Sequence, residues 1–390
     1  MNEVILKKTR AAVARPGHPW IYRSQIERVR GTPSPGDQVA VLSAADRFLG
    51  IGYFNEKSEI TVRILSEDSR PLDKEFFKER MESAAAFRKR FVRDAGAFRV
   101  VSSEADELPG LIIDRYGEVL VVQFLTCGME RLRETALEAA REVFSPVGIY
   151  ERSDSSSRQL EGLEEKTGWI ERSCGSEVIV EEKGIRYRVL FGEGHKTGLY
   201  LDQRENRCLL ADLGIRGEAL DVFCYEGGFG LHLASRGAKV LAIDIQEEAI
   251  KRGEEHRKLN AIPEEFLQFK TANAFDALRS LEKEKKKFEL VILDPPSFVK
   301  KKSALEGAIS GYKELLLRSM KLLGSGGLLA VFSCSYHVDE NLLMQITMSA
   351  AWDAHKDLKV IRFLKQSADH PINPFIPETY YLKGFLFSIF

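Results

Sequence analysis

The sequence predicts an α/β protein whose C-terminal half forms a doubly wound parallel sheet, preceded by a β-rich N-terminal segment. From about residue 217 onward, short apolar runs alternate with charged stretches of helical composition. The first of these runs ends in a glycine-rich loop, which is typical of the first strand in a doubly wound sheet. In contrast, residues 1–70 contain short alternating runs between turn clusters and no long helical period.

The apolar runs of the C-terminal half have the length and composition of buried parallel strands. The predicted strands are 219–223, 239–244, 266–272, 288–294 and 327–333. Charged helical stretches lie between them, at 245–259 and 303–323. The final run, 384–390, is predicted to be an antiparallel last strand.

The pattern changes several times before this sheet. Residues 1–70 fit a small β-barrel or sandwich. Residues 71–98 are rich in charge and alanine, and their apolar spacing predicts a helix of about five turns. Residues 99–126 then read as strand, turn and strand, and residues 129–143 as a second helix. A β-hairpin is expected over residues 178–191.

Length and composition restrict the class of protein. The 390 residues are enough for two or three domains, and 44% apolar with 29% charged residues is ordinary for a globular protein. No run approaches the roughly 20 apolar residues of a membrane span, and the N-terminal residues lack the apolar core of a signal peptide. The five cysteines form no CxxC pair, which argues against a disulfide scaffold and a structural zinc site. We therefore expect a cytoplasmic protein with reduced cysteines.

Charge is distributed unevenly along the chain, although the formal net charge is only -1. Residues 1–100 contain 19 Lys or Arg against 13 Asp or Glu, whereas residues 101–180 contain 8 against 16. A polyanion is therefore expected to prefer the N-terminal part of the protein.

The loop after the first parallel strand runs from Asp221 to Gly230 and contains three glycines. Glycine allows a backbone to approach a ligand closely, although a tight turn also explains a GGxG sequence. The pattern is not GxGxxG, since the third glycine position holds Leu233, and this disfavours a dinucleotide pyrophosphate. Asp244 ends the second strand, where a carboxylate can accept hydrogen bonds from two ribose hydroxyls.

The loop after the fourth strand reads Asp294-Pro295-Pro296-Ser297-Phe298. Two prolines stiffen this loop and remove two backbone donors, so it can hold a flat ring with the Asp side chain at the polar edge of that ring. The sequence Asp-Pro-Pro also occurs in plain turns that bind no ligand. Its place at the carboxyl end of a parallel strand favours the binding role.

A cysteine, Cys334, follows the fifth strand in the sequence Ser333-Cys334-Ser335. A lone cysteine is usually a small buried apolar residue. In this place, however, its loop is expected to face the loop that carries Asp294, and a thiol there can act as a nucleophile.

Taken together, these motifs resemble the RlmI-like family of 23S ribosomal RNA (cytosine-5) methyltransferases, which depend on S-adenosylmethionine (AdoMet) and carry an N-terminal PUA domain. The combination of GHKTGLYLDQR, DPPSF and SCS in this order is specific, whereas each motif alone is weak. The segments that carry the resemblance span essentially the whole chain and are 17–26, 104–117, 149–154, 194–207, 221–230, 293–302, 311–315 and 332–335.

The resemblance implies three domains. Residues 1–70 look like a PUA β-barrel that binds structured RNA, which agrees with their positive charge. Residues 71–180 resemble the central α/β domain of the family. Residues 181–390 look like a class I, Rossmann-like methyltransferase domain, with the hairpin at 178–191 as the linker.

The resemblance also implies a bound AdoMet and no metal. The glycine loop would pass under its methionine part and Asp244 would hold its ribose. The position after the third strand, usually Asp in relatives, is Asn273 here, and its side-chain carbonyl can still accept a hydrogen bond from the adenine amine. The residues assigned to the cofactor are Gln203, Arg204, Asp221, Phe223, Tyr225, Gly227, Gly228, Gly230, Asp244, Asn273, Ala274 and Asp294. Those assigned to RNA and the base pocket are Pro295, Pro296, Phe298, Lys300 and Tyr312.

The implied reaction is methylation of C5 of a cytosine in 23S ribosomal RNA or its precursor particle. Cys334 adds to C6, C5 attacks the AdoMet methyl group, and loss of the C5 proton with expulsion of Cys334 completes the turnover. Asp294 would hydrogen-bond at N3 and stabilise the charge that develops there. The base must leave its stack to react. Members of the family tend to dimerise, and the sequence adds no independent signal for a dimer.

Three other readings stay open. The DPPSF loop also resembles the (N/D)PP(Y/F) loop of amine-directed methyltransferases, in which case the target is a guanine or an exocyclic amine and Cys334 only lines the pocket. A non-catalytic RNA-binding factor with a vestigial methyltransferase fold is the second. The third, a nicotinamide-dependent oxidoreductase, is weakened by the missing third glycine.

Overall fold

A computed structural model describes all residues except 9–16, 173, 193–197 and 299–304, and divides the chain into two compact units. The first unit comprises Met1–Val180, Val189–Leu201 and Ala368–Thr379. The second comprises Glu181–Arg188, Asp202–Ser367 and Tyr380–Phe390. The chain therefore passes from one unit to the other five times. No helix in the described part is both long and apolar enough to cross a membrane.

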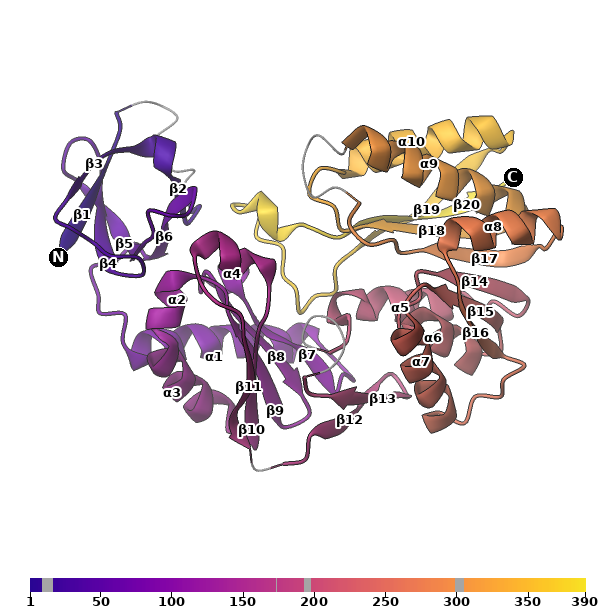
Figure 1. The fold of residues 1–390 in the computed structure, drawn as a ribbon, viewed down its shortest axis with the longest axis horizontal. Helices are drawn as coiled ribbons and strands as arrows, with labels where there is room; N and C mark the ends of the chain where they lie inside the picture. Colours follow the sequence, from indigo (N-terminus) through magenta and orange to yellow (C-terminus); the bar gives the residue numbers. More distant parts are fainter. Residues whose placement is uncertain (9–16, 173, 193–197, 299–304) are drawn as a thin grey trace. The chain divides into compact units, whose positions relative to one another are not determined.

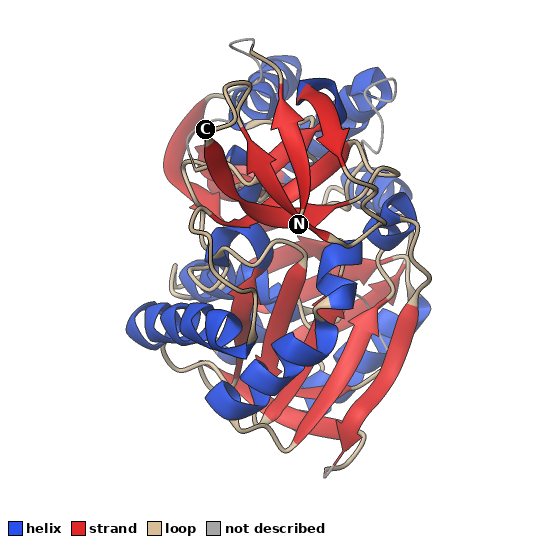
Figure 2. Ribbon diagram, turned by 90° about the vertical axis from the view of Figure 1, so that its left-hand side faces the viewer, coloured by secondary structure: helices blue, strands red, loops and turns tan. Residues whose placement is uncertain are grey.

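The first unit begins with a six-stranded sheet in the order β2-β6-β5-β4-β1-β3. Its strands are β1 (Asn2–Leu6), β2 (Trp20–Tyr22), β3 (Ile26–Arg30), β4 (Gln38–Leu42), β5 (Phe48–Phe54) and β6 (Ile60–Ser66). Strands β1 and β4 are parallel and the other neighbours are antiparallel. Figure 2 shows the strands of this sheet in red close to the N-terminus. Buried Val4, Ile21, Val39 and Val62 belong to its small core, which confirms the β-rich prediction.

A second sheet, in the order β11-β10-β9-β8-β7, follows in the same unit. Its strands are β7 (Ala97–Ser102), β8 (Leu111–Tyr116), β9 (Val119–Phe124), β10 (Gly148–Ser153) and β11 (Lys166–Arg172). The helices are α1 (Lys74–Phe91), α2 (Cys127–Arg131), α3 (Arg133–Phe144) and α4 (Ser156–Glu161). Apolar side chains of α1 and α3, such as Phe77 and Leu137, are buried with those of β8 and β9, such as Ile113 and Val122.

Local signals move the boundaries of the predicted helices in this region. The helix of about five turns expected within 71–98 is confirmed, since α1 has 18 residues; Asp73 caps its first turn through the N–H of Phe76, and β7 begins at Ala97. The helix expected over 129–143 is two helices that meet at Leu132. The segment 99–126 contains a third strand as well, since the short turn between β8 and β9 is hidden in a continuous apolar run.

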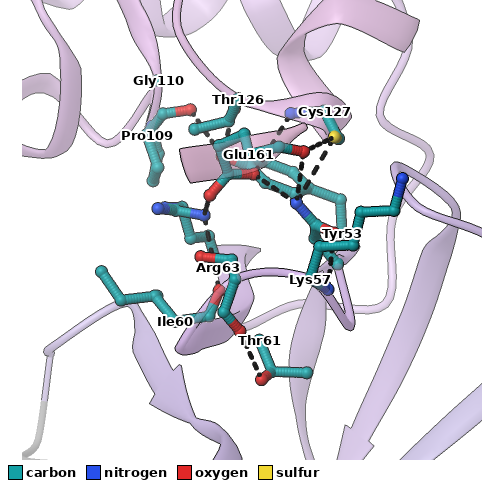
Figure 3. Close-up of polar contacts among 12 residues, drawn as sticks. Tyr53, Lys57, Ile60, Thr61, Arg63, Pro109, Gly110, Thr126, Cys127 and Glu161 are labelled. Carbon is teal, nitrogen blue, oxygen red and sulfur yellow. Dashed lines mark hydrogen bonds and ion pairs between the residues drawn. The ribbon is translucent and has the colours of Figure 1, made fainter. Parts of the chain in front are cut away.

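A buried polar cluster joins the two sheets of the first unit (Figure 3). Arg63 of β6 donates to Glu161 at the end of α4 at 2.8 Å, and the two side chains are 9% and 3% exposed. Asn55 donates to the same carboxylate at 2.8 Å. Nearby, the hydroxyl groups of Tyr53 and Thr126 lie 2.7 Å apart. Polar groups buried in this way need partners, so the cluster fixes the N-terminal sheet against the segment that follows it.

The second unit is a seven-stranded sheet in the order β16-β15-β14-β17-β18-β20-β19. Its strands are β14 (Glu218–Val222), β15 (Lys239–Asp244), β16 (Leu267–Thr271), β17 (Phe288–Leu293), β18 (Leu323–Ser333), β19 (Leu358–Lys365) and β20 (Lys383–Ile389). Strands β14 to β18 pair in parallel, and β20 pairs antiparallel with both β18 and β19. This arrangement confirms the doubly wound sheet and its antiparallel strand at 384–390.

Helices cover both faces of this sheet (Figure 1). They are α5 (Arg204–Ala211), α6 (Gly228–Ser235), α7 (Glu247–Leu259), α8 (Ala274–Lys283), α9 (Leu305–Leu322) and α10 (Glu340–Ala354). Side chains of α8, α9 and α10 share one core with the sheet, whereas α5, α6 and α7 pack together on the other face. The strand order reverses between β14 and β17, and ligands bind at such a switch point, outside the carboxyl ends of the strands.

The predicted hairpin is present as β12 (Glu177–Glu182) and β13 (Ile185–Leu190). Its tip belongs to the second unit, where Glu182 is buried against Arg207 at 2.6 Å and His232 at 3.0 Å. Burial alone would raise the pKa of Glu182, but the charge and hydrogen bonds of these two partners lower it to about 2. The carboxylate is therefore ionised beneath α6.

Candidate active site

The glycine loop between β14 and α6 has an unusual backbone. Phe223 and Tyr225 have φ angles of 65° and 52°, and Gly227 has a φ angle of 76°. Non-glycine residues rarely adopt this left-handed region, and such strain concentrates at ligand sites. The loop is held from outside, because the N–H of Tyr225 donates to Asp244 at 2.9 Å and that of Cys224 donates to Ile243 O at 3.0 Å.

Asp221 lies at the end of β14 and is fully buried. Its Oδ2 accepts a hydrogen bond from Gly230 N–H at 3.0 Å, whereas its Oδ1 is buried with no hydrogen-bond partner among the described residues. Burial raises the pKa of Asp221 to about 7, and the charges of Asp294 and Asp244 add to this rise. A buried carboxyl oxygen without a partner favours a ligand with a positive charge or a donor at this place.

Asp244 and Asn273 follow the next two strands of the sheet. Both oxygens of Asp244 are fixed by backbone donors at 2.9 Å, from Tyr225 and from Gln246. Each oxygen keeps a second lone pair, so the carboxylate can still accept from a diol. The carbonyl oxygen of Asn273 caps α8 by accepting from the N–H of Phe275 at 3.0 Å. Asn273 itself is exposed, next to Ala274 at the start of that helix.

Gln203 connects the segment before α5 to the proline loop. Its side chain is buried, and Nε2 donates to Asp294 Oδ2 at 3.0 Å. Its carbonyl oxygen accepts in turn from Asn206 at 2.6 Å, so the amide is held from both ends. This bond orients the Asp294 carboxylate, which itself follows the last residue of β17. Arg204, which was also expected at the site, is buried at the start of α5.

The proline loop and the cysteine loop meet at the carboxyl edge of the sheet. Ser297 and Ser335 connect them through their hydroxyl groups at 3.1 Å. The sequence predicts that these loops face each other, and this contact confirms it. Cys334 is exposed between two fully buried serines, so the reading of Cys334 as a buried apolar residue is wrong.

Aromatic side chains support the proline loop from below. The ring centroid of Phe298 lies 5.1 Å from that of Tyr312 and 6.4 Å from that of Phe223. Tyr312 donates to Ser333 at 3.0 Å, and burial raises its pKa to about 12, so the phenol stays neutral. Pro295 is buried, whereas Pro296 is exposed and available to a ligand. Lys300, expected to contact RNA, lies outside the described residues.

One polar residue near the cysteine loop was missed in the sequence. Lys383 begins β20, and its backbone pairs with that of Ser333 across the strands. Only 6% of the residue is exposed, and Nζ donates to the carbonyl oxygen of Ser335 at 3.5 Å. The sole hint is that a lysine directly precedes a buried apolar strand.

The side chains at this edge suit AdoMet. Three carboxylates, of Asp221, Asp244 and Asp294, stand at the carboxyl ends of β14 and β15 and just after β17. AdoMet carries positive charge on its sulfonium and its amino group, which compensates such a cluster. The Oδ1 atom of Asp221 is the open acceptor within it. Asp244 would hold the ribose, and the strained glycine loop would lie against the methionine part.

Comparisons with known proteins give the family. Residues 4–67 match the PUA-like domain family, and residues 155–387 match the S-adenosylmethionine-dependent methyltransferase family. The chain is 38% identical over 373 residues to the ribosomal RNA large subunit methyltransferase I of Shewanella denitrificans, covering 94% of both chains. It is 37% identical over 376 residues to the protein of the same name from Pseudoalteromonas atlantica, covering 95% of both.

Solved structures agree on the fold. A putative SAM-dependent methyltransferase from Streptococcus mutans has a TM-score of 0.85 and 19% identity, with full coverage of both chains. A second putative methyltransferase, solved in complex with SAH, has a TM-score of 0.86 at the same identity and coverage. With the two matched domains and relatives at 38% identity, the chain belongs to the AdoMet-dependent methyltransferases that carry an N-terminal PUA-like domain, the family of the ribosomal RNA large subunit methyltransferases I.

Proposed function

We propose that this chain methylates C5 of a cytosine in large-subunit ribosomal RNA, with Cys334 as the nucleophile. The contact between the proline loop and the cysteine loop carries this proposal, because it brings an exposed thiol beside the loop of Asp294 at the edge that suits AdoMet. The names of the curated relatives support ribosomal RNA as the substrate. The PUA-like domain supports RNA as well, since its segment lies within residues 1–100, where Lys and Arg outnumber Asp and Glu.

The chemistry of cytosine explains why both a thiol and a carboxyl group are needed. C5 of cytosine is a weak nucleophile. When the Cys334 thiolate forms a bond to C6, electron density moves to C5 and to N3. A hydrogen bond between N3 and the Asp294 carboxyl group, with the shared proton taken up from solvent, stabilises that charge, and Gln203 holds the carboxyl group in place. Loss of the C5 proton to solvent and cleavage of the S–C6 bond then restore the aromatic ring and the free thiolate.

AdoMet supplies the electrophilic methyl group in this scheme. The chain's own residues hold AdoMet: the glycine loop and Asp244 fix its position, and the Asp221 carboxyl group matches its positive charge. The target base is expected between Pro296 and the cysteine loop, because Pro295, Phe298 and Tyr312 are packed beneath. A base can reach this place only after it leaves its stack.

The test is transfer of labelled methyl from AdoMet to large-subunit ribosomal RNA, read by nucleoside mass spectrometry. We expect labelled 5-methylcytidine from the wild-type protein and at least a thousandfold loss of rate in Cys334→Ala with near-normal AdoMet affinity. Cys174→Ala is the matched control, since Cys174 lies in the first unit. Labelled methylguanosine, or full activity of Cys334→Ala, would refute the covalent mechanism and favour the amine-directed alternative.

Trapping a covalent adduct is a second, independent test of the mechanism. RNA with 5-fluorocytosine at the target has no C5 proton to lose, so the enzyme should remain bonded to it through Cys334. We expect a denaturation-resistant complex with the wild-type protein and with Cys174→Ala, and none with Cys334→Ala. Absence of the complex from a protein that binds AdoMet and methylates RNA would also argue for the amine-directed reaction.

A further inference from the structure

The side chain of Lys383 is placed in an unusual environment. It starts β20, the strand between β18 and β19, and pairs with Ser333 immediately before Cys334. Although a lysine prefers water, only 6% of this residue is exposed. Its Nζ makes one long hydrogen bond, of 3.5 Å, to Ser335 O, and lies 5.9 Å from the centre of the Tyr380 ring.

The described carboxylates provide no ion-pair partner for this ammonium group. Glu340 is occupied by a hydrogen bond from the Tyr380 hydroxyl group. Asp339 accepts from the N–H of Leu342 at 2.8 Å and caps α10. On the other side, Lys365 of β19 is the cross-strand neighbour of Lys383 and adds positive charge. A buried cation without a bonded anion is costly, which is the condition under which such a residue is usually functional.

The thiol of Cys334 can also become an anion, and it lies between Ser333, which pairs with Lys383, and Ser335, whose carbonyl oxygen accepts from Lys383. The charges of Cys334, Asp339 and Glu340 all act to keep Lys383 protonated against its burial, which lowers the pKa of the lysine. Tyr312 also faces Cys334 but stays neutral, and Asp294 carries the same sign as a thiolate. Among these groups only the two lysines favour the thiolate, and Lys365 is exposed to water, which screens its charge.

We propose that Lys383 is a positioning residue whose buried ammonium group holds Cys334 as the thiolate. The proposal rests on the proposed role of Cys334 as the nucleophile. In the resting protein the thiol proton goes to solvent and the ammonium and thiolate charges compensate each other. When the sulfur forms a bond to C6 of the base, its negative charge moves into the ring. Lys383 then loses its anion, and this favours later expulsion of the thiolate.

The test measures the thiol itself and therefore does not depend on which base is methylated. The rate of alkylation of Cys334 by iodoacetamide is followed from pH 6 to pH 10 in the full chain, with the modified peptide quantified by mass spectrometry. Lys383→Met is expected to shift the midpoint of this profile upward by about one unit, which makes alkylation at pH 7 about tenfold slower. Lys383→Arg keeps the positive charge and should retain the wild-type midpoint.

The alkylation rate of Cys174, measured in the same samples, controls for general changes in thiol reactivity. An unchanged Cys334 midpoint in Lys383→Met overturns the proposal, as does an equal shift in Lys383→Met and Lys383→Arg. If Lys383→Met unfolds, Lys383→Gln replaces it, since an amide can keep the hydrogen bond to Ser335 without the charge.

Methyl transfer by the variant is then compared with that of the wild-type protein. Lys383→Met should lower kcat about tenfold with an unchanged KM for AdoMet, and raising the pH should restore much of the rate. A shifted thiol profile together with labelled methylguanosine would refute the proposed function alone.

Discussion

Removing the charge of Glu161 should destabilise the first unit strongly. In Glu161→Gln the side chain keeps its size, but Arg63 remains as a buried cation without an anion. Its Nε already lacks a hydrogen-bond partner among the described residues, so the loss of the Glu161 charge leaves the guanidinium group poorly compensated. Breaking one side of a buried ion pair costs about 3–5 kcal/mol. In a unit of this size that corresponds to roughly 6–20 °C in Tm.

Tryptophan fluorescence during urea unfolding measures this change in the first unit alone. Of the three tryptophans, Trp20 and Trp169 lie in the first unit and Trp352 lies in the second. A Trp352→Phe background leaves only the first two as reporters, and Trp352 is 82% exposed, so its replacement should be harmless. The shift in the urea midpoint, multiplied by the slope, gives the loss of stability.

An exposed pair in the same sheet provides the control. Arg30 and Glu3 are 3.0 Å apart, but their side chains are 43% and 34% exposed. Glu3→Gln should therefore cost less than about 1 kcal/mol. The double variant Arg63→Leu with Glu161→Leu should be more stable than Glu161→Gln, because it leaves no buried charge. If Glu161→Gln costs no more than Glu3→Gln, the reasoning from burial is refuted.

Two further predictions concern the cofactor edge of the second unit. Asp221 has a pKa near 7 when folded and near its usual 3.8 when unfolded, so without AdoMet the stability of this unit should fall as pH rises from about 4 to 7. Asp221→Asn should remove that slope in urea unfolding at pH 5 and pH 7.5, and an unchanged slope would contradict the assignment. Gly227→Ala should cost at least about 1–3 kcal/mol and weaken AdoMet binding in calorimetry, because φ is 76° and the new Cβ would lie 2.5 Å from the Phe269 ring. Wild-type affinity in that variant would show that the loop tolerates a side chain.

The sequence predicted the second unit better than the first. Buried parallel strands such as 239–244 are continuous apolar runs between charged helices, and this pattern depends little on tertiary context. In contrast, β19 and α10 were missed. Strand β19 is an edge strand with five consecutive exposed residues, so it has no alternation of apolar and polar positions. The sequence of α10 is apolar over much of its length, with exposed Met348 and Trp352 obscuring the helical period.

In the candidate site, too, some residues could be predicted from the sequence and others could not. Asp221, Asp244, Asp294 and Cys334 were placed at strand ends, because the ends of parallel strands meet at one edge. The residues that neighbour these four depend on which strands pair antiparallel, and the local pattern of apolar and polar residues does not predict that pairing. Lys383 reaches the cysteine loop only because β20 inserts next to β18 in one particular register.

The path of the chain also sets limits on how the protein acquires its structure during synthesis. Buried Arg88 donates to the backbone of Asp369, a residue 281 positions further along, and the side chain of Asp369 accepts from Arg99 N–H at 2.9 Å. The first unit is therefore incomplete until Asp369 has left the ribosome. Contacts of such sequence separation slow folding and prolong exposure of unfinished surfaces. Emergence of Ala368–Thr379 for the first unit and of Tyr380–Phe390 for the second, rather than of the N-terminal half, should therefore time the last folding step of each unit.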